Sequence, residues 1–187
     1  MKKFLIIALV MVMLIPAALF AKGFSVGVGA TAATGSTISS VLETQQVDVN
    51  AFNYGGYANV KAFLVSVNAT MFPIFNEGQQ FVYFTGDLSA NLAVDISVLR
   101  VQAGLSVNYF GSTDFDTWAF QFENENIMDA PLSLRAEVDV ILGDLNIGVW
   151  GILPTTLTLN TFDKIFDLDV KDRWQDASLG LCLGFCF

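Results

Sequence analysis

Hydrophobic residues alternate with small or polar residues along most of the chain. In residues 179–187, Leu and Phe occupy every second position, and Gly and Cys lie between them. Successive side chains of a β-strand point to opposite faces, so this period predicts a strand with one apolar and one modestly polar face. The same pattern predicts seven further strands, over residues 24–30, 52–60, 63–71, 84–96, 101–109, 132–140 and 145–153.

The connections between these strands alternate between short and long. A few residues join the second strand to the third, the fourth to the fifth and the sixth to the seventh, the last through Gly143-Asp144. The longer connections, 35–46, 73–80, 111–130 and 154–176, therefore lie at one end of the sheet. Weaker alternation in the last of them predicts that its flanking strands continue as a hairpin turning near Asp163, with a bulge near Trp174.

The first 21 residues have a separate character. Lys2 and Lys3 precede an apolar run from Phe4 to Phe20, and the small residue Ala21 follows it. This order is typical of a secretory signal peptide, so we expect residues 1–21 to be removed and residues 22–187 to form one domain. A retained single-pass anchor is the alternative, because a run of about 17 residues is near the lower limit for a spanning helix.

Hydrophobic residues make up 53% of the chain. Beyond residue 21 they alternate with small or polar residues and form no apolar run long enough for a spanning helix. An exported chain of this kind enters a membrane as a closed barrel, whose strands satisfy one another's backbone hydrogen bonds. A water-facing surface carries about 25–35% charged residues, whereas the polar face here is mainly Gly, Ser, Asn and Thr. The sequence therefore predicts an all-β, eight-stranded antiparallel up-and-down transmembrane barrel, with a secreted soluble barrel as the alternative.

Aromatic residues gather near the predicted strand ends, as they do at the two interfaces of a membrane. The predicted girdle at the long-loop end consists of Phe52, Tyr54, Phe72, Phe75, Phe81, Phe84, Tyr109 and Phe110. The predicted girdle at the short-turn end consists of Phe24, Phe63, Phe185 and Phe187.

The signal peptide, the eight amphipathic strands and the final Phe185-Cys186-Phe187 together resemble the small eight-stranded outer-membrane proteins of the OmpW, OmpX and OmpA-barrel type. The resemblance covers residues 22–187, and the long loops favour the OmpW-like group. It implies a place in the outer membrane of a two-membrane bacterium, among outer-membrane lipids. It also implies that Phe185 and Phe187 form part of the signal read by the barrel-assembly machinery.

Charge and composition exclude several kinds of chemistry. The formal net charge of −9 excludes nucleic acid as a partner, because phosphates are repelled. The chain has no His, on which the outer-membrane deacylases, phospholipases and proteases of this size class depend, so we expect no enzyme activity and no cofactor. Cys182 and Cys186 lie about 13 Å apart on one strand, too far for a disulfide. Without His to join them, they predict no zinc site of the usual kind and no other metal site.

Few charged residues lie on the predicted inward face. We expect Asp95, Arg135, Glu137 and Asp139 to form a network of ion pairs in the lumen, with a gate or selectivity element as the alternative. Trp150 and Ile152 are also predicted to point inward, either as packing or as a constriction or pocket for a small hydrophobic molecule. An eight-stranded barrel is barely wider than its side chains, so no large pore is expected.

Two functions remain after this reasoning. The first is an integral outer-membrane barrel with a structural or limited permeability role, porin-like and directed to small hydrophobic solutes. The alternative is a surface adhesin that displays the acidic loops 111–130 and 154–176 to a host or surface ligand. The acidic residues of these loops are expected to form a solvated rim, with calcium bridging as the alternative.

Overall fold

The computed structural model describes residues 23–34, 43, 52–74, 81–114, 119–122, 130–161 and 173–187. The predicted signal peptide, residues 1–21, lies outside these residues, and so do Asp163 and most of the acidic loop residues. In the described part of the chain, no helix has both the length and the apolar character needed to cross a membrane.

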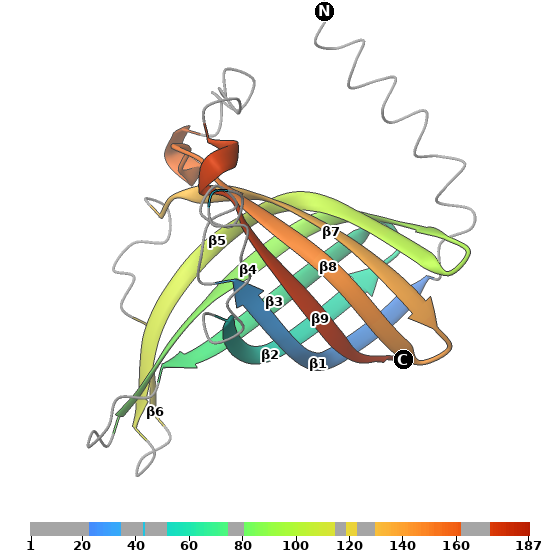
Figure 1. The fold of residues 1–187 in the computed structure, drawn as a ribbon, viewed down its shortest axis with the longest axis horizontal. Helices are drawn as coiled ribbons and strands as arrows, with labels where there is room; N and C mark the ends of the chain where they lie inside the picture. Colours follow the sequence, from blue (N-terminus) through green and yellow to red (C-terminus); the bar gives the residue numbers. More distant parts are fainter. Residues whose placement is uncertain are drawn as a thin grey trace, which may run out of the picture.

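Eight antiparallel strands form a closed barrel (Figure 1). They are β1 (Phe24–Thr34), β2 (Phe52–Ala62), β3 (Val65–Ile74), β4 (Phe81–Ile96), β5 (Leu99–Asp114), β7 (Leu132–Leu142), β8 (Leu145–Pro154) and β9 (Ser178–Cys186). Each strand pairs with its neighbours in the chain, and β9 returns to pair with β1. This confirms the eight strands predicted from the alternation.

The barrel closes at the end where the strand series begins and finishes. Val26 and Phe187 exchange two backbone hydrogen bonds of 3.0 and 2.8 Å, and the amide of Cys186 donates to the carbonyl of Asp144 at 2.7 Å. Because β1 and β9 are joined, the ring of eight strands has its backbone groups paired on both sides. This is the arrangement that hydrocarbon requires of a membrane-spanning sheet.

Three tight turns join β2 to β3, β4 to β5 and β7 to β8. Each contains a residue with positive φ: Phe63 at 54°, Ser97 at 59° and Gly143 at 66°. Two-residue hairpin turns favour this left-handed conformation, which costs glycine nothing and other residues some strain. The three turns lie at the end of the barrel where the C-terminus is marked (Figure 1), and the amide of Phe63 in the first turn donates to the carbonyl of Gly23 just before β1, as the count of strands predicted.

The outer and inner faces of the barrel differ sharply in chemistry. On β9, Leu181, Leu183 and Phe185 are 52–56% exposed, whereas Cys182 is 3% exposed. The buried polar and charged side chains include Lys61, Asn68, Arg100, Gln102, Arg135, Glu137 and Asp139. A soluble barrel has the opposite arrangement, so the structure confirms the predicted transmembrane barrel.

The long connections contain more structure than the sequence analysis predicted. Within the predicted loop 111–130, β5 continues to Asp114 and a short strand, β6 (Ala119–Phe122), pairs with it. β4 and β5 reach beyond their neighbours β3 and β7, so β5 offers an unpaired edge that β6 covers. Figure 1 shows this three-stranded ribbon projecting from the barrel.

The predicted extension of the last two strands is wrong for the residues that the structure describes. β8 ends at Pro154, and residues 159–161 form a 3-10 turn. Leu157 is buried, and its carbonyl accepts a 2.7 Å hydrogen bond from the amide of Leu132. This bond folds the chain back over the start of β7 and ends the alternation. The bulge predicted near Trp174 is instead a 3-10 helix, η3 (Trp174–Asp176).

Candidate functional site

The lumen at the short-turn end holds a buried cluster around Asp95. The Nζ of Lys61 lies 3.0 Å from Asp95 Oδ2, and the Nε of Arg100 lies 2.8 Å from Asp95 Oδ1. Arg100 also donates to Ser25 at 3.1 Å and to Asn59 at 3.4 Å. Asp95 was predicted to share a network with Arg135, and Arg100 was not among the predicted network residues. Asp95 and Arg100 face each other across the β4–β5 hairpin, so its register was the signal that could have identified the pair.

A second cluster lies deeper in the barrel, around Arg135. Its Nη1 is 2.6 Å from Asp87 Oδ2, and its Nη2 is 2.9 Å from Glu137 Oε2. Thr70 donates to the same Asp87 oxygen at 3.0 Å. All four side chains are nearly inaccessible to solvent. Arg135 therefore binds two buried carboxylates, Glu137 of its own strand and Asp87 of β4, and Asp87 was not among the predicted network residues.

Two asparagines connect these clusters. Asn59 accepts from Arg100 and donates to Asn68, and Asn68 donates to Glu137 at 2.7 Å. The hydrogen-bonded chain therefore runs from Asp95 near the turns to Asp87 on the far side of Arg135. Asn and other small polar side chains fit this role because they satisfy charged neighbours without adding charge of their own.

Asp139 occupies a different position from Glu137. It is 0% exposed, and it accepts from Gln102 at 2.7 Å and from Asn146 at 3.3 Å. The Sγ of Cys182 lies 3.7 Å from Asp139 Oδ1 and 3.5 Å from Glu137 Oε1. Asp139 thus accepts from two neutral donors and contacts the Glu137 carboxyl, while Glu137 also binds Arg135.

Glycines on the inner face make room for these larger groups. Gly148 lies between Asp139 of β7 and Cys182 of β9 in the sheet register. A Cβ at Gly148 would overlap the Asp139 carboxylate and the Cys182 sulfur. A Cβ at Gly180 would overlap the indole ring of Trp150. The inward glycines Gly148 of β8 and Gly180 of β9 therefore leave the space that the side chains of Asp139, Cys182 and Trp150 occupy.

An apolar layer adjoins the polar network. Trp150, Tyr57, Phe72, Ala33 and Cys182 form one buried cluster, and the partly buried Ile152 packs against it. The indole Nε1 of Trp150 donates to Thr31 at 3.1 Å, so the only polar atom of the indole is satisfied. The predicted pair Trp150 and Ile152 thus lies together in the lumen, within a larger plug.

Two aromatic residues depart from the predicted girdle. Phe72 was expected among the interfacial aromatics, but it is 7% exposed and lies 6.5 Å from Trp150, ring centroid to centroid. It has the same parity along β3 as the buried Thr70, which places it inside the barrel. Phe84 is 3% exposed, because it packs against Tyr109 and above Gly111.

The outer wall has a hollow near the long-loop end. It has a volume of about 640 Å³, and its lining is almost wholly apolar. Small residues of adjacent strands, Ala103, Ala136 and Gly151, pair with one another in the register and form its base. The hollow is bordered by the outward side chains of Leu105, Leu134, Leu153 and Leu179, and by Trp174.

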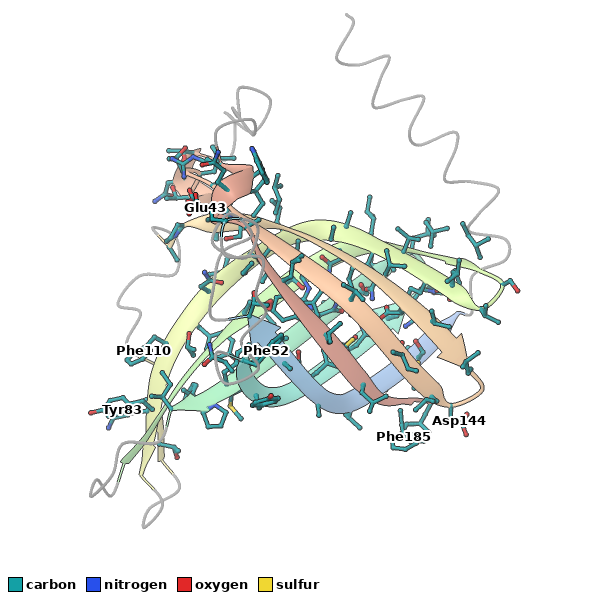
Figure 2. The ribbon with its side chains drawn as sticks, in the orientation of Figure 1. Glu43, Phe52, Tyr83, Phe110, Asp144 and Phe185 are labelled. Atoms are coloured by element: carbon teal, nitrogen blue, oxygen red, sulfur yellow. The ribbon has the colours of Figure 1, made fainter. Side chains whose placement is uncertain are left out.

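The projecting ribbon carries aromatic side chains outside the barrel. Tyr83 of β4 and Phe110 of β5 stack with their centroids 5.9 Å apart. Figure 2 shows both residues on the part of the ribbon that extends away from the barrel, at the opposite end from Asp144 and Phe185. This end of the molecule therefore carries a stacked pair of aromatic rings on two paired strands.

Comparison with known proteins found similarity in fold alone. No protein-family model and no curated protein matches the chain. The crystal structure of Neisserial surface protein A is similar, with 14% sequence identity, coverage of 88% of this chain and 96% of that chain, and a TM-score of 0.39. The N-terminal β-barrel domain of Pseudomonas aeruginosa OprF has 15% identity, coverage of 87% of this chain and 97% of that chain, and a TM-score of 0.44. Ail of Yersinia pestis, in complex with the heparin analogue sucrose octasulfate, has 11% identity, coverage of 88% of this chain and 97% of that chain, and a TM-score of 0.39. At identities and TM-scores this low, the similarities carry no information about ligand, activity or partner.

Proposed function

We propose that this protein is an integral outer-membrane barrel of a two-membrane bacterium that binds a small hydrophobic solute at the hollow in its wall. The exposed leucines, valines and phenylalanines of the eight strands support a place in hydrocarbon. Charged residues on such a surface would cost about 2–4 kcal/mol each at the bilayer midplane. Bacterial barrels of this size lie in the outer membrane, which the predicted export signal at residues 1–21 also favours.

The lumen is unsuited to an open aqueous pore. The network from Asp95 to Asp87 and the Trp150 cluster occupy the interior at successive levels. An eight-stranded barrel leaves little width beyond its own side chains. This filling of the interior supports our proposal that a small hydrophobic solute binds at the wall and not along the lumen axis.

The observation that carries the proposal is the row Ala103, Ala136 and Gly151. Three neighbouring strands have small residues at the same level, where the other outward positions of these strands are mostly Leu, Val and Ile. Because these three positions have no large side chain, a recess of about 640 Å³ is left in the wall. This volume is within the range of small-molecule sites. Arg135 is the one charged residue among the described residues that line the recess, and its side chain points into the lumen. The recess therefore favours an apolar ligand.

The hollow can be tested by filling it. Ala136→Leu places a larger side chain on its base, and Ala90→Leu makes the same change at an exposed outward position of β4 outside the hollow. The refolded protein in lipid nanodiscs is titrated with a brominated fatty acid, which quenches the fluorescence of the adjacent Trp174. We expect saturable quenching in the wild type and in Ala90→Leu, and its loss in Ala136→Leu. Equal quenching in all three, or quenching without saturation, would contradict the proposal.

The alternative function, a surface adhesin, has one observation in its favour. β4 and β5 pair along their length and project from the barrel with β6, which pairs with residues 111–114, and Tyr83 and Phe110 stack on this ribbon. Deletion of residues 113–127 removes β6 while leaving the pairing of β5 with β7, which spans Leu99–Val107. If the protein is an adhesin, this deletion abolishes adherence of expressing bacteria to mammalian cells and leaves the folded barrel intact. Adherence that is absent in the wild type would exclude this function.

A further inference from the structure

We propose that Glu137, Asp139 and Cys182 form a binding site for one divalent, zinc-type metal ion inside the barrel. Their ligand atoms, two carboxylate oxygens and one sulfur, lie within 4.8 Å of one another. The three side chains come from β7 and β9 and are all buried. The distance along the chain between the two cysteines does not matter for this site, because it uses one cysteine and the carboxylates of another strand.

The spacing of the three ligand atoms fits a tetrahedral ion. With Zn–S and Zn–O bonds of about 2.3 and 2.0 Å, the edge between a sulfur and an oxygen of a tetrahedron is about 3.5 Å. The Sγ of Cys182 lies 3.5 Å from Glu137 Oε1 and 3.7 Å from Asp139 Oδ1. The side chains therefore require little movement to bind a metal at their centre.

Because Gly148 has no side chain, two of the proposed ligands, Asp139 and Cys182, can approach each other. It lies between Asp139 and Cys182 in the register, and both the Asp139 carboxylate and the Cys182 sulfur occupy the volume of its missing Cβ. Any larger residue there would separate them. The convergence thus depends on a specific position of the sheet and does not follow from acidic composition alone.

Unsatisfied polar atoms next to the cluster are a second, independent observation. Among the described residues, the Tyr57 hydroxyl and Asn146 Oδ1 are buried and have no hydrogen-bond partner. Tyr57 is 5% exposed, packs in the same cluster as Cys182, and interacts electrostatically with Glu137, Asp139 and Cys182. Asn146 is 3% exposed, and its amide contacts Asp139. Buried polar atoms normally find partners, and the Tyr57 hydroxyl oxygen can complete the coordination of a metal held by the other three ligands.

The charge balance of the lumen favours a cation at this position. In the described barrel, four inward carboxylates, those of Asp87, Asp95, Glu137 and Asp139, face three basic side chains, those of Lys61, Arg100 and Arg135. Asp139 accepts from the neutral donors Gln102 and Asn146 and lies in hydrogen-bond contact with the Glu137 carboxyl, so two carboxyl groups meet at this point without a cation between them. On binding, the S–H bond of Cys182 breaks, its proton leaves to solvent, and a sulfur–metal bond forms. With all four carboxylates ionised, the three basic side chains leave a net lumen charge of −1, and a doubly charged ion together with the Cys182 thiolate brings this charge to zero.

The donor set identifies the class of metal. A thiolate with two carboxylates and a neutral oxygen suits a borderline ion such as Zn²⁺ or Co²⁺, and does not suit Ca²⁺ or Mg²⁺, which prefer oxygen ligands alone. The site is part of the buried polar network, because Glu137 also binds Arg135, so the ion enters while the barrel folds and is then enclosed.

The direct test is cobalt binding by the protein refolded in detergent. Refolding with Co²⁺, followed by removal of free metal, is expected to retain one equivalent of cobalt, with a thiolate-to-cobalt charge-transfer band and the strong visible bands of tetrahedral coordination. Zn²⁺ added during refolding is expected to prevent these bands. Folded wild-type protein that retains neither cobalt nor zinc would overturn the proposal, since the carboxylates then hold a proton instead.

Two cysteine variants make the test specific. Cys182→Ser removes the proposed ligand, whereas Cys186→Ser changes a buried cysteine on the same face of β9 that lies beside Arg100. We expect the charge-transfer band to disappear in Cys182→Ser and to persist in Cys186→Ser, with folding of both verified by the gel shift between boiled and unboiled samples. Gly148→Ala, which leaves all ligands present but separates them, is expected to lose cobalt as well. A band that survives Cys182→Ser or depends on Cys186 would also overturn the proposal.

Discussion

The guanidinium of Arg135 lies over the indole ring of Trp150, with 4.8 Å between Cζ and the ring centroid. This contact joins the two layers that fill the barrel, because Arg135 belongs to the polar network and Trp150 to the apolar plug. A guanidinium suits this position because it stacks on an aromatic face while its edge donates to carboxylates. The lumen is therefore closed by one continuous assembly of side chains.

Loss of Arg135 is expected to destabilise the barrel strongly. Arg135→Leu leaves Asp87 and Glu137 buried without their cation, which costs about 3–5 kcal/mol. The free energy of unfolding in urea, measured on the refolded protein in micelles, checks this value. Arg173→Ala, in the loop before β9, is the control and is expected to change stability by no more than about 0.5 kcal/mol. Equal stability of the two variants would mean that the network contributes little.

Gly180, which packs against the indole ring of Trp150, is expected to lose stability when even one methyl group is added. Gly180→Ala places a Cβ inside the volume of the indole ring, so the ring must move and lose its hydrogen bond to Thr31. Overpacking of this kind costs about 1–3 kcal/mol, and the fluorescence of Trp150 should shift. Gly56→Ala is the matched control, because nothing lies within 4 Å of the added Cβ. If the two substitutions have the same effect, Trp150 is not packed as described.

A charge on the outer face is expected to cost more at mid-strand than near a turn. Leu181 lies near the centre of β9 and Leu142 lies at the end of β7, and they are 52% and 54% exposed. Leu181→Arg should cost about 2–4 kcal/mol in a bilayer and Leu142→Arg about 0–1 kcal/mol. Urea unfolding in lipid vesicles measures both. Equal costs would indicate that water, and not hydrocarbon, covers this face.

The aromatic residues at the end of β9 are expected to act in assembly more than in stability. If Phe185 and Phe187 are read by the assembly machinery, Phe185→Ser with Phe187→Ser should lower the amount of folded barrel recovered from the outer membrane of expressing cells. Refolding of the same variant in detergent should remain efficient. Phe24→Ser, an equally exposed aromatic at the same end of the barrel, should leave assembly unchanged. A similar loss with Phe24→Ser would show that this end needs aromatic residues in general.

Sequence periodicity predicted the barrel well because the rule behind it is local. A strand between hydrocarbon and a narrow lumen alternates between apolar and polar or small residues at every position. The types of Leu181 and Cys182 therefore indicate which residue faces outward and which inward, even when the neighbouring strands are not known. The three tight turns were also predictable, because the gaps between these strands are only a few residues long.

The arrangement of the lumen was predictable only in part, because it depends on which strands lie opposite one another. Asp95 pairs with Lys61 and Arg100, and Arg135 reaches Asp87 across the barrel, 48 residues away in the chain. Phe72 was placed in the membrane interface because aromatics are common there, although its parity along β3 indicated the inside. β6 could not be predicted from its own four residues, because its position depends on the free edge of β5.

The central claim, that hydrocarbon covers the outward face of the strands, is tested most directly by a nitroxide label on that face. Val149→Cys, at a position 51% exposed on β8, is labelled in the folded protein, in which Cys182 and Cys186 are buried, and studied by electron paramagnetic resonance in lipid vesicles. The account predicts a label that collides readily with dissolved oxygen and rarely with a water-soluble nickel complex. Nickel collisions as frequent as those of a label at Asp144, in the exposed turn, would contradict it.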